Sequence, residues 1–394
     1  MKKLLSILLL VFMMLNLSSC VVLYSFGQIM GMTDQGVDSD LKYSPCPEDF
    51  EKAEAPLGTT CAFTYFVPTK DAFYYIDEDF CLYRADSEGT KTVEFSNMTY
   101  FSTQLIDPWL RYSDDKLYFT AFDESSSKSG KLYCYENGSE EPKLLAETKC
   151  DYGNWDIYKD SFVYIPYEAD YDSETYPYNL YTLTSLDLKS SKSKEISKDN
   201  VVDFKIVDGK LIFVTYDEKN GFEVSSCDPD GNNMALCGKV DMEYNSKYGY
   251  IDAYHITEDY VVLWGDTGVG SSETDLVVFS LETAETKLYE FPLYSSTFVA
   301  CKGYGFITFV REDEDPLDNP EPMDNEGIFR IDLATGETEL VSKELAFNSA
   351  LVAFDEDCVY VQRTHRNELT GDFITEYSRI KTGEKPTLVY SYDE

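Results

Sequence analysis

The sequence predicts an all-β protein, a single β-propeller of about seven four-stranded antiparallel blades. Three observations carry this prediction: a turn and an apolar-aromatic strand recur seven times, a hairpin pattern follows each copy, and helical periodicity is absent after residue 30. Hydrophobic residues make up 43% of the chain, and 32 residues are Tyr, which favours strands. The composition therefore supports a large core built from strands.

The first recurring element is a turn residue, a variable residue and then an apolar-aromatic strand. Neighbouring copies lie about 44 to 54 residues apart, the length of one propeller blade. The seven copies read KDAFYYI at Asp71, DDKLYFT at Asp115, KDSFVYI at Asp160, DGKLIFV at Gly209, EDYVVLW at Asp259, KGYGFIT at Gly303 and EDCVYVQ at Asp357.

The second element is a strand, a tight turn and a charged strand, which together predict a β-hairpin. Asn-Gly, Asp-Gly and Thr-Gly steps at these turns tolerate positive φ, as hairpins require. Copies begin at Leu82, Leu132, Leu183, Phe222, Leu276, Ile328 and Tyr377. A short strand also precedes each first element, for example at 155–158 and 202–206, so each repeat holds four strands. An array of Ig-like domains would need linkers, and none separates the repeats.

The N-terminus has the pattern of an export signal. Lys2 and Lys3 precede an apolar run from Leu4 to Leu15, and Leu17-Ser18-Ser19-Cys20 follows. These four residues resemble the bacterial lipobox, which implies that Cys20 becomes the lipidated N-terminus. The expected organisation is a signal peptide at 1–19, a lipidated tether at 20–58 and the propeller at 59–394. An uncleaved anchor is the alternative, because residues 4–33 carry no charge. Both alternatives place the propeller outside the cytoplasm.

The chain is strongly acidic. Its formal net charge is −39, and removal of the signal, which takes two lysines and no acid, makes it −41. Such a surface repels nucleic acid and anionic lipid headgroups, so neither is expected as a direct ligand. A solvated acidic surface needs no partner to explain it.

The blades resemble TolB-like and YWTD (low-density-lipoprotein-receptor-like) propellers. The resemblance lies in Phe73-Tyr74-Tyr75-Ile76, in 82–86 and in the turn at 228–232, and it spans 61–394. The YWTD tetrapeptide itself is absent. The resemblance implies a fold and no activity, because such propellers serve as enzymes, scaffolds and receptors.

Ten cysteines are present, and export permits disulfides. Cys46 with Cys61 is one candidate pair. Cys227 and Cys237 flank a turn, but the Asp230-Gly231 step centres that turn too early for them to face each other, so we do not expect this pair. With only two His and no closely spaced Cys pair, a zinc site is not expected.

No catalytic motif is recognisable, and no cofactor site is expected. His255, in the first strand of the fifth blade, is expected to be packed or solvated. The segment from Asp228 to Asn232 resembles a calcium loop, but Lys239 stands where the bidentate Glu should be, so it is expected to be a turn. The Gly-rich and nucleophile-elbow motifs are absent.

Binding residues are expected in the connections between second and third strands, which share one face and vary in length. Three of these connections contain the candidates. The third blade's connection has a tyrosine cluster, the sixth has eight carboxylates within 311–327, and the seventh has a basic group. The candidates are Tyr167, Tyr171, Tyr176, Tyr178, Asp313, Asp315, Asp318, Asp324, Arg363, His365 and Arg366. The four Asp are candidate ligands for a divalent cation or a basic partner, against the simpler interpretation of a solvated loop.

The sequence therefore predicts a membrane-anchored lipoprotein of the bacterial cell envelope, on its periplasmic or extracellular side. Its expected role is non-enzymatic binding or scaffolding of a protein or glycan at the loop face. The alternative is an envelope or polysaccharide-processing enzyme with a site built from loop carboxylates. A sensory ectodomain is disfavoured by the lipobox.

Overall fold

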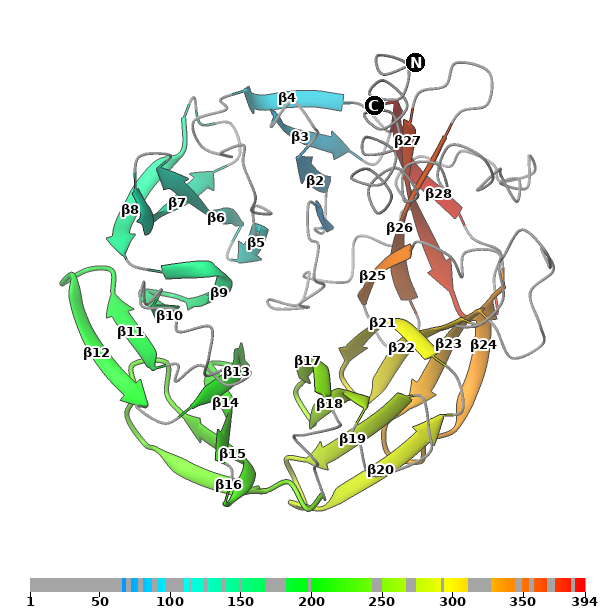
Figure 1. Ribbon diagram of the computed structural model, residues 1–394. Helices are drawn as coiled ribbons and strands as arrows, with labels where there is room; N and C mark the ends of the chain where they lie inside the picture. The colour runs from blue at the N-terminus through cyan, green and yellow to red at the C-terminus, as the bar shows by residue number, and fades with distance from the viewer. Residues whose placement is uncertain are drawn as a thin grey trace, which may run out of the picture.

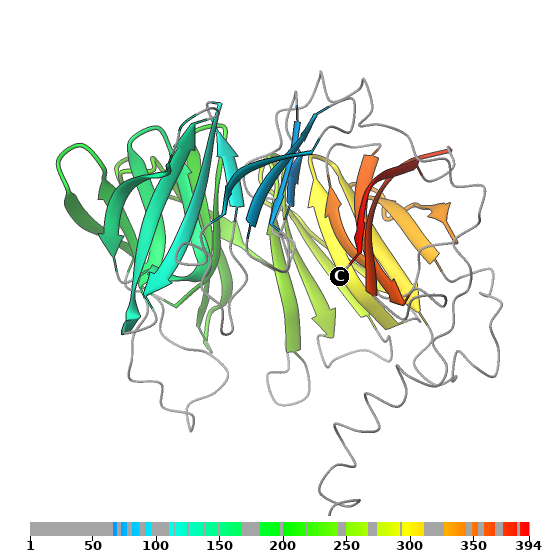
Figure 2. The same ribbon diagram turned by 90° about the horizontal axis from the view of Figure 1, so that it is seen from above.

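A computed structural model describes residues 66–393, except 69–71, 77–80, 87–90, 97–109, 114, 124–125, 137–138, 140, 149, 167–181, 198–199, 218, 243–249, 267–273, 292–293, 311–326, 344–348, 354–357, 367–372 and 384–386. The described residues form seven four-stranded antiparallel sheets, which confirms the predicted all-β propeller. In Figure 1 the sheets follow one another around a ring in chain order, and Figure 2 shows this ring from its edge. Within the described chain there is no helix long and apolar enough to cross a membrane.

Each blade consists of four consecutive strands. Blade 1 has β1 (Phe66–Pro68), β2 (Ala72–Ile76), β3 (Cys81–Asp86) and β4 (Lys91–Ser96). Blade 2 has β5 (Leu110–Ser113), β6 (Lys116–Asp123), β7 (Ser126–Glu136) and β8 (Lys143–Thr148). Blade 3 has β9 (Cys150–Tyr158), β10 (Ser161–Pro166), β11 (Leu183–Asp187) and β12 (Lys192–Ser197). Blade 4 has β13 (Val201–Val207), β14 (Lys210–Asp217), β15 (Gly221–Cys227) and β16 (Ala235–Lys239).

The remaining three blades continue the same arrangement. Blade 5 has β17 (Tyr250–Ile256), β18 (Tyr260–Asp266), β19 (Thr274–Ser280) and β20 (Thr286–Phe291). Blade 6 has β21 (Tyr294–Cys301), β22 (Tyr304–Val310), β23 (Gly327–Asp332) and β24 (Thr338–Ser342). Blade 7 has β25 (Ser349–Ala353), β26 (Cys358–Arg366), β27 (Phe373–Lys381) and β28 (Thr387–Asp393).

The order of strands within every sheet is the order of the chain. The first strand of each blade lies nearest the ring axis, and the fourth lies at the rim (Figure 1). Inner strands contact inner strands of neighbouring blades, as β9 contacts β13 and β13 contacts β17. Because every described sheet uses four consecutive strands, blades 1 and 7 share no sheet.

The hairpin turns have the chemistry that the sequence predicts. In blade 6, Asp332 Oδ1 accepts hydrogen bonds from the backbone N–H groups of Ala334 (2.8 Å) and Thr335 (2.9 Å). Gly336 then adopts a φ of +76°, in the left-handed region that a Gly occupies without strain. The side chain and the Gly together close the turn between β23 and β24.

The turn between β15 and β16 is the hairpin predicted at 228–232. The backbone N–H of Asp228 donates to Asn232 O (2.8 Å), and Gly231 has a φ of +73°. Cys227 and Cys237, on either side, are free thiols, which confirms that they do not pair. Burial raises the pKa of Cys227 to about 11, so this thiol stays protonated and unreactive at neutral pH. Cys46 and Cys61 lie outside the described residues.

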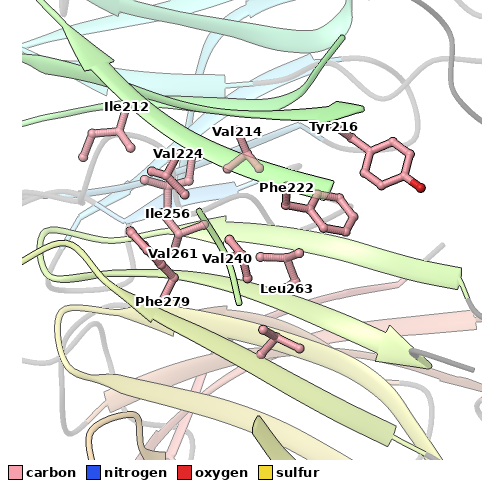
Figure 3. Close-up of a cluster of buried hydrophobic side chains, with 11 residues drawn as sticks. Ile212, Val214, Tyr216, Phe222, Val224, Val240, Ile256, Val261, Leu263 and Phe279 are labelled. Carbon is pink, nitrogen blue, oxygen red and sulfur yellow. The ribbon is translucent and has the colours of Figure 1, made fainter. Parts of the chain in front are cut away.

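The core is a series of apolar layers between neighbouring blades. Figure 3 shows the layer between blades 4 and 5, where side chains of β14, β15, β17, β18 and β19 interdigitate. Phe222 (1% exposed) belongs to this layer, with its ring centroid 4.7 Å from that of Tyr216. Full burial of each such side chain contributes about 1.5–3 kcal/mol, so a blade is stabilised mainly by its neighbours.

Candidate functional site at the ring axis

One position on the inner strands distinguishes four of the seven blades. It is the residue that pairs with the third residue of the second strand. The pairs are Val67 with Tyr74, Arg111 with Tyr118, Asp156 with Val163, Lys205 with Ile212, His255 with Val262, Val299 with Phe306 and Val352 with Tyr360. We call this the axial position. It holds Val in blades 6, 7 and 1, and a charged residue or His in blades 2 to 5. We call Arg111, Asp156, Lys205 and His255 the axial tetrad.

The side chains of the tetrad are buried and face the following blade. Their exposed fractions are 5% for Arg111, 3% for Asp156, 9% for Lys205 and 5% for His255. The Arg111 guanidinium lies over the Trp155 ring of blade 3, 5.5 Å from its centroid. Because alternate residues of a strand face opposite sides, the neighbouring residues on these strands pack toward the preceding blade.

Asp156 links blade 3 to blade 4. Its Oδ1 accepts a hydrogen bond from Ile157 N (2.8 Å), and its Oδ2 accepts one from Ile206 N (2.9 Å). Ile206 lies in β13, which pairs only with β14, so the inner edge of β13 has no partner strand. The carboxylate therefore satisfies a buried backbone donor that the sheet leaves unpaired.

Burial opposes the charged forms of the tetrad. It raises the pKa of Asp156, although Arg111 and the two backbone donors act in the opposite direction. Burial lowers the pKa of Arg111 and that of Lys205, and the Asp156 carboxylate opposes both shifts. Arg remains charged in proteins even so. The axis therefore holds two buried basic side chains near one carboxylate that already accepts two hydrogen bonds.

Asp203 adds a second carboxyl beside the tetrad. It is two residues before Lys205 on β13, so both side chains are on the same side of the strand. Asp203 is partly exposed. Desolvation raises its pKa to about 7, against the effects of the Phe204 N–H, Lys205 and Arg111. Asp203 is therefore only partly ionised at neutral pH.

His255, the tetrad residue of blade 5, packs against an aromatic side chain. Its ring meets the Phe298 ring of blade 6 edge to face, with centroids 5.0 Å apart. Burial, and to a lesser degree the Lys205 charge, lowers its pKa to about 3, so the imidazole is neutral under ordinary conditions. Its Nε2 atom is buried and has no hydrogen-bond partner among the residues that the structure describes. The expectation of a packed or solvated His in the first strand of blade 5 is thus confirmed as packed.

Most candidates predicted from the sequence lie outside the described residues. These are Cys20, Tyr167, Tyr171, Tyr176, Tyr178, Asp313, Asp315, Asp318 and Asp324. Among the described residues, no group of three or more His, Cys, Asp or Glu is arranged to hold a metal ion.

The sequence analysis placed the basic group of blade 7 in a loop, but the structure places it in a strand. Arg363, His365 and Arg366 belong to β26, where they pair with Glu376, Ile374 and Phe373 of β27. The prediction was wrong because β26 and β27 are long strands, so pairing continues past the apolar residues. The three residues end β26 and immediately precede its connection to β27.

Sequence reasoning singled out His255 and missed the rest of the axial tetrad. The signal was present, because each tetrad residue lies six positions before the first buried apolar residue of the next strand. Those apolar residues are Leu117, Phe162, Leu211 and Val261. Alignment of the seven copies at that residue would have placed Arg, Asp, Lys and His in one column.

Comparison with known proteins supports the fold. No protein-family model matches the sequence, and no curated protein matches it. Solved structures that do match include an oligogalacturonate lyase in complex with manganese, at 12% identity over 84% of this chain and 90% of that chain, with a TM-score of 0.50. The β-propeller domain of the Trilobed protease from Pyrococcus furiosus matches at 12% identity over 86% and 99%, with a TM-score of 0.51.

TolB from Acinetobacter baumannii is also similar, at 10% identity over 81% of this chain and 65% of that chain. Its TM-score of 0.39 is too low to carry an argument about function. At such identities the matches confirm the β-propeller fold alone, because this fold is shared by enzymes and binding proteins.

Proposed function

We propose that this protein is a lipid-anchored binding protein of the bacterial cell envelope. Cys20 tethers it to a membrane, and the face that carries the second-to-third connections binds a protein or glycan partner without catalysing a reaction. Nucleic acid is not its ligand, because a net charge of −39 repels a polyanion.

The observation that carries this proposal is the unequal length of the connections. Turns between first and second strands are short, as from Val207 to Lys210. Between second and third strands, β10 ends at Pro166 and β11 begins at Leu183, and β22 ends at Val310 and β23 begins at Gly327. These connections leave the same face of the ring because their strands run in the same direction. Long connections on a rigid scaffold are where binding residues concentrate.

The anchor is tested by Cys20→Ser. We expect the wild-type protein in the membrane fraction and an intact mass that lacks residues 1–19 and includes acyl chains. The variant should lose the lipid and either leave the membrane or keep its signal. A wild-type mass that includes residues 1–19 without lipid would contradict the proposal and favour the uncleaved anchor.

The binding face is tested with the propeller as a secreted protein from residue 59. Gly-Ser linkers replace 167–182 and 311–326 in one variant. The control shortens a turn on the opposite face, 228–233, to Asn-Gly. Binding to purified envelope glycan and to solubilised envelope proteins is measured by co-sedimentation, with thermal unfolding as a check on folding. We expect the first variant alone to lose binding. Equal binding by all three proteins, or equal loss in both variants, would contradict the proposed face.

One observation favours the alternative of an envelope or polysaccharide-processing enzyme. Asp203, with a pKa of about 7, can exchange a proton at neutral pH, as general acids and bases do. If it does so in catalysis, wild-type protein should release reducing ends from envelope glycan, and Asp203→Asn should not. Absence of turnover in the wild type leaves the binding proposal as it stands.

A further inference from the structure

The connection between β14 and β15 ends in an Asn-Gly step. Asn220 is exposed, and Gly221, the first residue of β15, has a φ of +74°. Apart from its chain neighbours, no atom of the described residues lies within 4 Å of the position that a Cβ on Gly221 would take. The Asn220 side chain and the backbone nitrogen of Gly221 therefore lie next to each other at an open surface, with no side chain at 221 to separate them.

The turn before Gly221 is closed by Asp217 and not by the Asn220 side chain. The backbone carbonyl of Asp217 accepts a hydrogen bond from Asn220 N (3.2 Å). Asp217 Oδ1 accepts hydrogen bonds from Lys219 N (2.9 Å) and Asn220 N (3.0 Å), as in an Asx turn. Within the described part of the chain, the side-chain amide of Asn220 makes no hydrogen bond. This amide is therefore free to react without breaking a bond that holds the turn.

The other described hairpin turn of blade 4 gives a direct contrast. Asn232 Nδ2 donates to Asp230 Oδ2 (2.8 Å), and Asn233 Nδ2 donates to Asp228 Oδ2 (2.5 Å). Neither of these Asn residues is followed by Gly. A side-chain amide that is hydrogen-bonded, and that is followed by a residue with a Cβ, is hindered from reaching the next backbone nitrogen. Asn220 has neither restraint.

We propose that Asn220 is a site of spontaneous deamidation. The backbone nitrogen of Gly221 gives up its proton to solvent base and bonds to Cγ of Asn220, and the side-chain nitrogen leaves as ammonia. The product is a five-membered cyclic imide, which one water molecule then opens. Breakage of the bond from the Gly221 nitrogen to Cγ gives Asp, and breakage of its bond to the main-chain carbonyl carbon gives isoaspartate. The reaction needs no enzyme and no reactant other than water.

Either product changes the loop face at blade 4. The site lies on that face because it belongs to the connection between a second and a third strand. Both products add one negative charge, and isoaspartate also adds a carbon atom to the main chain. Asp217 pairs with Gly221 in the ladder between β14 and β15, so an added main-chain atom before Gly221 disturbs that pairing. The modification itself does not depend on whether the loop face binds a partner.

The proposal is tested by peptide mapping. The propeller, secreted from residue 59, is incubated at neutral and at mildly alkaline pH and digested, and its peptides are separated by liquid chromatography and identified by mass spectrometry. We expect deamidation at Asn220 to be many times faster than at Asn232 and Asn233, which serve as references within the same blade. The rate should rise with pH, because the deprotonated Gly221 nitrogen is the attacking group, and isoaspartate should appear beside Asp.

Two variants separate this chemistry from simple exposure. Gly221→Ala places a Cβ beside the attacking nitrogen and should slow the reaction; thermal unfolding checks that the strain of Ala at positive φ leaves the protein folded. Asn220→Gln keeps an exposed amide without strain at 221, but its longer side chain requires a six-membered ring, so deamidation should nearly stop. An unmodified Asn220 at alkaline pH, or equal rates at Asn220, Asn232 and Asn233, overturns the proposal. A rate in folded Gly221→Ala or in Asn220→Gln that equals the wild-type rate overturns it as well.

Discussion

Substitution of Asp156 by Ala should be among the most destabilising single changes in the ring. The change removes both hydrogen bonds that Asp156 accepts, including the 2.9 Å bond from Ile206 N that joins blades 3 and 4. It leaves that donor buried at the inner edge of β13. It also removes the Asp156 carboxylate, which lies buried near Arg111 and Lys205.

The magnitude follows from these two losses. A buried donor left without a partner costs about 1–3 kcal/mol. Removal of one member of a buried charged group costs about 3–5 kcal/mol, because the other charge stays buried. The two effects overlap, so we expect a loss of about 3–5 kcal/mol, a large fraction of the total stability of about 5–15 kcal/mol that is typical of domains.

Urea unfolding of the propeller, followed by far-UV circular dichroism and fluorescence, measures this loss. Asp160→Ala is the control, since Asp160 is an exposed Asp of the same blade whose carboxylate bonds to the exposed Lys189. The control should leave the urea midpoint nearly unchanged. If Asp156→Ala and Asp160→Ala have the same midpoint, Asp156 does not hold the blades together and the argument fails.

Four further predictions concern packing and charge. Between about pH 4 and 7, Asp203 keeps a proton in the folded protein that it loses in the unfolded chain, so the free energy of unfolding should fall as the pH rises. The total fall should be up to about 4 kcal/mol, measured by urea unfolding at several pH values. Asp203→Asn should remove this dependence on pH. Phe222→Ala should cost about 3–5 kcal/mol by opening a cavity between blades 4 and 5, measured by urea unfolding against Leu288→Ala at the exposed rim. Deletion from Ala350 onward removes blade 7 and should yield an aggregating chain by light scattering; a soluble, cooperatively folding product would contradict the ring. His255→Val, which installs the residue of blades 6, 7 and 1, should change stability by less than about 1.5 kcal/mol, because the lost packing is offset by removal of an unpartnered Nε2.

The sequence predicted the fold well because each strand carries its own local pattern. The strand expected at 202–206 is β13, and the one expected at 155–158 is the end of β9. Apolar-aromatic runs and Asp- or Gly-containing turns determine both the strands and their hairpins, and the repeat fixes how many blades there are. Prediction failed at the end of β26, where Arg363 and His365 are paired although their polarity is typical of a loop.

The axial tetrad could not be predicted as a group from any single stretch of sequence. Arg111, Asp156, Lys205 and His255 each stand alone in a strand, where one polar residue ordinarily faces solvent. Only the register of the inner strands, together with closure of the ring, brings residues from four blades to one level of the axis. Their burial depends on the neighbouring blade rather than on their own strand.

The contrast between blades 2–5 and blades 6, 7 and 1 separates what the fold requires from what it tolerates. Val299 shows that an apolar side chain fills the axial position, and a buried charge there costs more than a buried methyl group. Asp156 has a structural reason for its place, since it satisfies the Ile206 N–H of the next blade. Lys205 and His255 have no such link to the described backbone, yet they occupy the same level of the axis. The ring packs Val at this position in blade 6, yet it buries Lys205 in blade 4 and His255 in blade 5, where burial lowers the pKa of both side chains. Burial of these two polar side chains therefore costs more than burial of Val would, and closure of the ring alone does not require them.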